Sequence, residues 1–247
     1  MRKIAVTLSK GGVGKTTTSV NLAAGLALAG RRVLVVDMDT QGQVAKMLGV
    51  QPAASMAEVV AGDAAIDYAL LPARDNLWLL PGGASLAGLK RVIARKDFGG
   101  ERTIDKALAP LDGRFDYVIL DTAPGWDTLT INALFYADEV LAPVALEVMA
   151  LQGLIEFTRK LEAIQQYNEG VALRYILPTF MDRRVRKSGE ILGQLERYFD
   201  ERLCPPIRYN VRLSEAPGYG QTIYEYARRS PGAEDYRSLT ERIIDDE

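Results

Sequence analysis

The chain has 247 residues, of which 48% are hydrophobic and 25% charged, and its formal net charge is −2 at pH 7. These proportions are ordinary for a folded chain with a large core, and no apolar run approaches the roughly 18 residues of a membrane-spanning helix. The lack of histidine and the single cysteine, Cys204, exclude Ser-His and Cys-His nucleophile pairs, His-ligated zinc, a disulfide framework and a four-cysteine iron–sulfur cluster.

The chain starts with a predicted strand, a glycine-rich loop and a predicted helix. Residues 3–8 are mostly apolar, and residues 15–29 have the apolar spacing of a helix. Glycines between them let backbone N–H groups approach phosphate oxygens, and the start of the helix adds the positive end of its dipole. Lys15 can reach the β- and γ-phosphates, and the Thr16 hydroxyl can bind Mg²⁺. The sequence therefore predicts a phosphate-binding loop made of Lys10, Gly11, Gly12, Val13, Gly14, Lys15, Thr16 and Thr17.

A second lysine stands at the front of this loop. A phosphate-binding loop needs only Lys15, which already covers the γ-phosphate region within one subunit. Lys10 at the mouth of the loop either stays in solvent or reaches a phosphate. It has more to gain from a nucleotide held by a facing subunit, although the spacing alone leaves both possibilities open.

Aspartates follow two of the next predicted strands. Asp37 and Asp39 come at the end of the apolar run 33–37, and Asp121 ends the run 117–121. Further strands are expected at 77–80, 139–144, 173–178 and 207–210, and further helices at 41–48, 85–96, 102–109, 128–136, 148–167, 187–200 and 233–244. This alternation predicts an α/β fold with a single doubly wound, mostly parallel sheet in one domain spanning residues 1–247. Ligands of such sheets lie beyond the carboxyl ends of the strands, so the loop and the aspartates are expected to share one site.

Several segments resemble one family. The sequence KGGVGKTT at 10–17 is similar to the deviant Walker A box of the ParA/MinD ATPases, which are P-loop NTPases. VLVVDMDTQG at 33–42 resembles the family's second strand and switch I, and YVILDTAP at 117–124 resembles its Walker B strand and switch II. NVRLSEAPGYG at 210–220 resembles a block of the partition-type ParA/Soj branch. With weaker matches at 130–134 and 150–154, the resemblance covers nearly the whole chain.

The resemblance implies roles for the site residues. It implies an ATPase that is slow without a partner, in which Lys10 contacts ATP across a homodimer and acts in catalysis with Lys15 and Asp39. Asp39 would position the attacking water. Asp121 would hold Mg²⁺ through a water together with Thr16, with Asp37 nearby. From the residues alone, Asp37 can equally be a solvated strand end or a helix N-cap. A loop at 178–183 resembles the segment near the adenine, but the individual contacts to the base stay open.

A basic cluster is the candidate DNA surface. The sequence pI is about 5.5, so the protein as a whole is no basic DNA binder. Such a cluster is usually a solvated face, but the resemblance implies nonspecific duplex DNA binding by Arg183, Arg184, Arg186, Lys187 and Arg212. Three or four phosphate contacts per subunit give a slope of log affinity against log salt of roughly −3, whereas about seven per dimer give roughly −6. Dimerisation by ATP would therefore switch DNA binding on.

The expected function is that of an ATP- and Mg²⁺-dependent dimer that binds DNA and positions a chromosome, plasmid or protein assembly. A ParB-like or other cargo adaptor would stimulate hydrolysis, and the protein would be cytoplasmic and nucleoid-associated in its ATP state. We expect no N-terminal helix-turn-helix extension before the loop, and the acidic residues 245–247 lead us to expect no C-terminal membrane-targeting helix.

Two alternatives and one departure remain open. The alternatives are a MinD-like ATPase acting on a membrane surface and a metabolic P-loop enzyme. Trp126 replaces a smaller residue in switch II, either as an anchor for a partner or by packing locally.

Overall fold

The computed structural model describes residues 1–182 and 184–247, so that Arg183, one of the residues predicted to face DNA, lies outside the described residues. The strands are β1 (Arg2–Val6), β2 (Val33–Asp37), β3 (Leu71–Arg74), β4 (Leu77–Leu80), β5 (Tyr117–Asp121), β6 (Glu139–Ala145) and β7 (Ala172–Thr179). The α-helices are α1 (Lys15–Leu28), α2 (Gln43–Leu48), α3 (Met56–Ala61), α4 (Ile66–Ala69), α5 (Leu86–Ala94), α6 (Thr103–Leu108), α7 (Thr128–Tyr136), α8 (Ala150–Gln165), α9 (Arg186–Phe199), α10 (Val211–Glu215), α11 (Ile223–Tyr226) and α12 (Pro231–Asp245). Short 3₁₀ helices are η1 (Gly100–Arg102), η2 (Ala109–Leu111), η3 (Asp200–Arg202) and η4 (Ala216–Tyr219).

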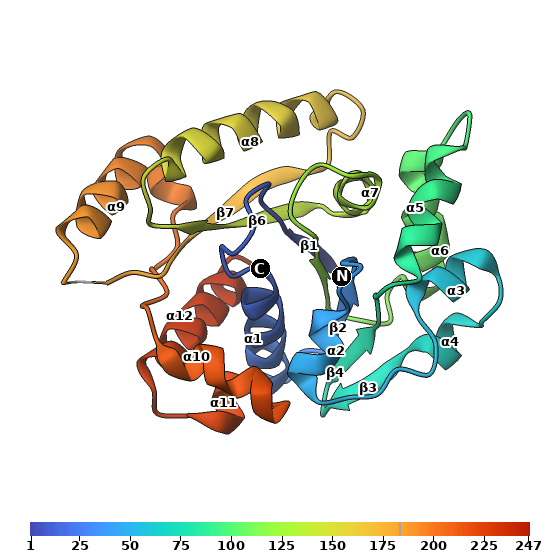
Figure 1. Cartoon of the computed structure of the whole chain (residues 1–247), viewed down its shortest axis with the longest axis horizontal. Coiled ribbons are helices and arrows are strands. Elements are labelled where there is room, and N and C mark those ends of the chain that lie inside the picture. Colours follow the sequence, from blue (N-terminus) through green and yellow to red (C-terminus); the bar gives the residue numbers. More distant parts are fainter. Residues whose placement is uncertain (183) are drawn as a thin grey trace.

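The described strands form a seven-stranded sheet in the order β3-β4-β2-β5-β1-β6-β7. All neighbouring strands are parallel except β3, which runs antiparallel to β4. Figure 1 shows α1 and α12 on one side of this sheet and α7 and α8 on the other. The predicted doubly wound, mostly parallel sheet is therefore confirmed.

The strands are apolar throughout because helices cover both faces of the sheet. Along β2, Val33 and Val35 pack into the core beside α1 and α12, whereas Leu34 and Val36 pack into the core beside α5 to α8. All four side chains are fully buried, and burying an aliphatic side chain of this size stabilises a fold by roughly 1.5–3 kcal/mol. A buried parallel sheet produces the continuous apolar runs from which the strands were predicted.

Two strand assignments differ from the prediction. The strand expected at 207–210 is wrong, because this segment forms only an isolated bridge between Met181 and Arg208. It runs beside β7, but Pro205 and Pro206 precede it and have no N–H group to continue a ladder. Strand β3 was not predicted, because it is short and contains Pro72. Proline is tolerated there since β3 lies at the edge of the sheet.

Candidate functional site

The phosphate-binding loop joins the end of β1 to the start of α1. Gly12 and Gly14 have φ angles of 73° and 89°, a region that residues with a Cβ seldom adopt. The Thr179 hydroxyl at the end of β7 donates to the Val13 carbonyl at 3.0 Å. The loop is therefore shaped by its glycines and held by a hydrogen bond from the end of β7.

Lys15 lies inside the loop that it follows. Its side chain is only 7% exposed, and its ammonium group donates to the Lys10 carbonyl at 3.0 Å. Burial lowers the pKa of Lys15, while the charges of Asp121 and Asp39 act in the opposite direction. The loop thus holds one desolvated cation whose remaining N–H groups are available to an anion.

Asp37 and Asp121 lie opposite each other at the ends of neighbouring parallel strands. Both are fully buried. The Asp37 carboxylate accepts from the Asp39 N–H at 2.9 Å, and the Asp121 carboxylate accepts from the Ser19 hydroxyl at 2.7 Å. Burial raises the pKa of both groups; for Asp37, the charge of Asp121 adds to this effect. Two buried carboxylates at neighbouring positions are stabilised in their charged form by a cation beside them.

The arrangement of these carboxylates fits Mg²⁺. The second carboxylate oxygen of Asp121 is buried and has no hydrogen-bond partner among the described residues. Thr16 follows Lys15 in α1 and adds a hydroxyl near Asp121. Within residues 1–182 and 184–247 no group of three or more His, Cys, Asp or Glu side chains could hold a metal ion by itself. Mg²⁺ is usually held by one or two carboxylates together with substrate phosphates and waters, which suits such a donor set.

A cavity of about 470 Å³ opens in front of the loop. One wall is the phosphate-binding loop with Asp39 and Gln41, and the other is formed by residues after β7 and around α10. Its full lining consists of Gly11, Gly12, Gly14, Lys15, Thr16, Thr17, Asp39, Gln41, Gln43, Thr122, Pro124, Thr179, Phe180, Ile207, Arg208, Tyr209, Asn210, Leu213, Ser214 and Tyr236. The structure thus brings most of the predicted loop together with Asp39, whereas Val13, Asp37 and Asp121 lie behind this lining.

The apolar end of the cavity is suited to a nucleobase. Phe180, Ile207 and Leu213 lie in its wall, and Phe180 has a φ angle of 57°. Such a backbone conformation costs free energy for a bulky residue and occurs most often at functional sites. Cys204 is not part of this wall, because it is packed into the core and only 3% exposed.

Lys10 is the one lysine of the loop that faces away from the cavity. Its ammonium group lies 2.6 Å from the carboxylate of Glu147, in the segment between β6 and α8. Both side chains are exposed, at 49% and 61%. The two lysines therefore have different environments: Lys15 lines its own cavity, and Lys10 is held at the rim by a solvated ion pair.

Comparisons with known proteins show which proteins the chain is similar to. A sequence model described as an AAA domain matches residues 1–173. The sporulation initiation inhibitor protein Soj of Bacillus subtilis is 37% identical over 246 residues, covering 97% of each chain. The chromosome-partitioning ATPase Soj of Thermus thermophilus is 38% identical over 246 residues, covering 99% of this chain and 96% of that protein.

The chain belongs to the Soj/ParA family of P-loop ATPases. A solved structure of cobyrinic acid a,c-diamide synthase from Mycobacterium smegmatis, with a bound ATP analogue and magnesium, is also similar. The two chains are 34% identical with a TM-score of 0.85, and the alignment covers 99% of this chain and 94% of the other. As a member of the Soj/ParA family, the chain is an ATPase.

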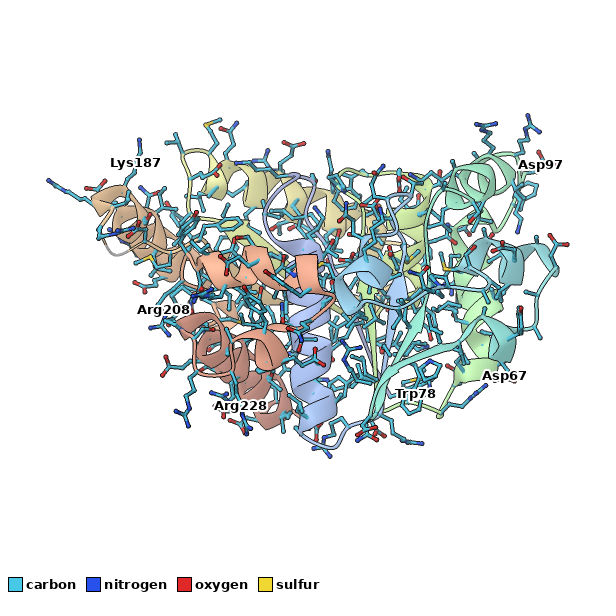
Figure 2. The ribbon with its side chains drawn as sticks, turned by 60° about the horizontal axis from the view of Figure 1, so that its bottom comes forward. Asp67, Trp78, Asp97, Lys187, Arg208 and Arg228 are labelled. Atoms are coloured by element: carbon cyan, nitrogen blue, oxygen red, sulfur yellow. The ribbon has the colours of Figure 1, made fainter. Side chains whose placement is uncertain are left out.

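The four described residues that were predicted to face DNA lie on exposed segments outside the cavity of this Soj/ParA protein. Arg184 pairs with Asp182 at 2.8 Å, Arg186 pairs with Glu190 at 2.9 Å, and Arg212 of α10 pairs with Glu215 at 2.8 Å. Figure 2 shows Lys187 at the outer end of α9. The structure thus places four cations on α9, α10 and the loop before α9, and three of them carry a carboxylate partner.

Trp126, in switch II, packs locally. Its ring centroid lies 5.3 Å from that of Phe157 in α8, and the Lys160 ammonium lies 5.7 Å from the indole centroid. Asp127 next to it caps α7 through the N–H groups of Leu129 and Thr130. Of the two interpretations of Trp126, the structure supports local packing, in this case against Phe157 of α8.

The sequence did not indicate Ser19 as a site residue, and it indicated Thr179 only as part of the segment 178–183 near the adenine, not as a support of the phosphate-binding loop. Ser19 orients Asp121 from the second turn of α1, and Thr179 supports the loop from β7. The position of Ser19 four residues after Lys15, on the same face of a helix, is the only sequence signal that could have found it.

Proposed function

We propose that this chain is an ATP-driven switch that binds ATP and Mg²⁺, dimerises around them, and holds nonspecific duplex DNA in the dimeric state. The observation that supports this most is the different placement of the two lysines of the loop. Lys15 serves its own cavity, whereas Lys10 stands exposed at the rim, where a second subunit would meet it.

ATP binding follows from the loop. The N–H groups of residues 11–17 surround the β- and γ-phosphates, and Lys15 neutralises part of their charge. Thr17 contacts the α-phosphate at the start of α1. The adenine occupies the apolar end of the cavity, where Phe180 and Leu213 exclude water from it.

Hydrolysis requires a water molecule in line with the γ-phosphate. Asp39 lines the cavity, and its carboxylate already accepts from the Gln41 N–H at 3.0 Å, so its orientation is fixed by its own loop. It positions the attacking water. Thr16 and Asp121 would hold Mg²⁺, with Asp37 behind them, and the bound ion would neutralise charge on the phosphate groups.

Dimerisation explains why Lys10 is exposed at the rim of the cavity. Facing subunits would bring two γ-phosphates close together, and a lysine from each side compensates their charge. A Lys10→Ala variant is expected to bind ATP as a monomer but to remain monomeric with ATP and Mg²⁺. Light scattering after size exclusion measures this, and a variant that dimerises as well as the wild type would refute the cross-subunit role.

The ion pair with Glu147 opposes this dimerisation. Exposed pairs contribute about 0–1 kcal/mol each, and a dimer releases two of them, so Glu147→Gln is expected to lower the protein concentration at half-dimerisation by up to about 30-fold. Glu156→Gln is the matched control, because Glu156 forms an exposed pair with Lys160 along α8. An equal change in both variants would mean that net charge and not the release of Lys10 is responsible.

DNA binding is the role proposed for Arg184, Arg186, Lys187 and Arg212. Reversing Arg186 and Arg212 to Glu is expected to abolish binding to duplex DNA while ATP binding and dimerisation persist. A single Arg186→Ala removes two contacts from a dimer, so the slope of log affinity against log salt should become shallower by roughly 2. Sequence should matter little, because phosphate contacts do not read bases.

The matched control reverses Arg228 and Arg229. Both are exposed, and Figure 2 shows Arg228 far from Lys187. Anisotropy on two unrelated duplexes measures all variants. Equal losses in the control and in the Arg186 and Arg212 variant would show a diffuse electrostatic effect and remove the assigned surface.

The relatives support a partition role for this DNA-bound state. The Thermus thermophilus relative is a chromosome-partitioning ATPase. A cargo adaptor, ParB-like or other, would stimulate ATP hydrolysis and release the dimer from DNA. The protein would then be cytoplasmic and associated with the nucleoid in its ATP state.

A membrane surface is the weaker site of action. In the described part of the chain no helix is long and apolar enough to cross a membrane. The last helix, α12, buries Tyr236, Leu239 and Ile243, as expected of a helix packed against α1 (Figure 1). Its apolar face is therefore already used and cannot lie on lipid without leaving the core.

The Mycobacterium smegmatis structure favours a second candidate function, ATP-driven amide synthesis. An enzyme that takes nitrogen from glutamine needs a reactive thiolate. The single cysteine, Cys204, is buried, and burial raises the pKa of its thiol to about 12. ATP turnover without any added small acceptor, rising with DNA, would separate partition from synthesis.

A further inference from the structure

Helix α2 connects the nucleotide site with a distant part of the molecule. At its start, the Val44 N–H donates to the Asp37 carboxylate at 3.3 Å, and the Gly42 N–H donates to the Asp39 carbonyl at 3.1 Å. Six helical residues span about 9 Å. Rigid elements of this kind carry displacement from one end to the other, so a shift of the backbone at 37–39 reaches the far end of α2.

The far end of α2 lies directly against the backbone of the segment that follows η4. Gly49 ends α2 and Gly220 ends η4, with φ angles of 66° and 63°. A Cβ on Gly220 would lie 2.7 Å from the Gly49 Cα, and a Cβ on Gly49 would lie 3.1 Å from the Gly220 Cα. The two main chains are in contact with no room for a side chain between them.

Arg74 of the edge strand β3 fastens this contact. Its guanidinium donates to the Leu48 carbonyl at 3.1 Å and to the Gly220 carbonyl at 2.9 Å. Both carbonyls stand at the ends of helical segments, where intrahelical partners run out. Glu225 holds the other edge of the guanidinium at 2.5 Å. The planar guanidinium holds its donors in fixed directions toward the two carbonyls, whereas a lysine has one ammonium group on a flexible stem and no such preset geometry.

Beyond Gly220 the contacts lead to Arg212. The rings of Tyr219 and Tyr226 stack with centroids 5.1 Å apart. The Tyr226 hydroxyl donates to the Glu215 carboxylate at 3.0 Å, and the same oxygen accepts from Arg212 at 2.8 Å. A continuous set of contacts therefore runs from the aspartates of the nucleotide site, through α2 and Arg74, to a cation proposed to bind DNA.

We propose that Arg74 is a positioning residue that couples the nucleotide state to α10. It holds the end of α2 against Gly220, so that a change at 37–39 on exchange of ADP for ATP reorients α10 and the ion pair of Arg212. This proposal rests on the proposed function, because it assumes that Arg212 binds DNA. In it, Arg74 itself contacts neither ATP nor DNA.

Two kinds of variant test this coupling. Arg74→Ala and Arg74→Lys remove the fork, and the lysine keeps the charge. Gly220→Ala leaves Arg74 intact and forces apart the contact between the Gly49 and Gly220 main chains, which we call the junction. Gly62→Ala is its matched control, because Gly62 has a φ angle of 80° and a Cβ there would meet nothing within 4 Å. The three junction variants are Arg74→Ala, Arg74→Lys and Gly220→Ala. Circular dichroism identifies those that fold, and one folded junction variant is enough to test the coupling.

The first readout is the ratio of DNA dissociation constants with ADP and with ATP. Allosteric couplings are typically about 5- to 150-fold, so each junction variant is expected to lower this ratio by at least about fivefold, while Gly62→Ala leaves it unchanged. Rescue by Arg74→Lys would mean that Arg74 acts only through its charge, and would overturn the proposal.

The second readout does not depend on DNA. Amide hydrogen exchange at residues 211–220 is expected to differ between the ADP and ATP states of the wild type, and this difference should disappear in the junction variants. If the wild type binds no DNA but shows this difference, the coupling stands and the DNA function fails. A difference that persists in the junction variants, or is missing in the wild type, contradicts the coupling.

Discussion

A Lys15→Gln variant is expected to bind ATP at least about 30-fold more weakly than the wild type. Hydrogen bonds to charged groups contribute about 1.5–3 kcal/mol each, and Lys15 is the only described lysine that lines the cavity. Glutamine is close in length, so the loop keeps its shape while the phosphates lose their central cation. Titration with a fluorescent ATP analogue measures the loss.

Lys46→Gln is the control for Lys15. It removes an exposed lysine from α2 outside the nucleotide cavity. ATP affinity in this control should match the wild type. Near-native affinity of Lys15→Gln would contradict the assignment of the loop as the phosphate site.

An Asp39→Ala variant is expected to keep ATP binding and to lose at least about 100-fold of its turnover, the usual contribution of a positioned acid–base group. The phosphates keep Lys15 and the loop, whereas the attacking water loses the carboxylate that orients it. The local turn survives, because the Gly42 N–H bonds to the main-chain carbonyl of residue 39.

This variant should also accumulate as a dimer with ATP and Mg²⁺. Hydrolysis would no longer empty the site, so the ATP-bound state persists. Phosphate release and light scattering follow the two effects in one sample, with Asp63→Ala, a change at an exposed aspartate, as the control. Unchanged turnover, or a persistent monomer, would show that Asp39 has another role.

The sequence predicted those parts of the fold that local patterns determine. The strands that are buried on both faces were identified, since such burial requires uninterrupted apolar runs. Strand β3 was not predicted, because it is an edge strand that pairs only with β4 and because its own residues include Pro72. The segment 207–210 has the composition of a strand, but the prolines before it prevent a ladder.

The candidate site was predictable to the same extent. The places of the loop and the aspartates in the fold could be predicted because they stand at strand ends, and their roles stay predictions. Ser19 meets Asp121 from 102 positions away, and Arg74 meets Gly220 from 146 positions away. Contacts over such distances are created by packing of the whole sheet, and no local pattern records them.

Anisotropy of a labelled duplex with the wild-type protein, measured across a salt series with ATP and with ADP in the presence of Mg²⁺, tests the central claim most directly. A dimer offering about seven phosphate contacts should show a slope of log affinity against log salt of roughly −6 with ATP. Binding with ADP should be feeble, with a slope of roughly −3. Equal affinity and equal slope in both nucleotide states would contradict an ATP-switched DNA-binding dimer.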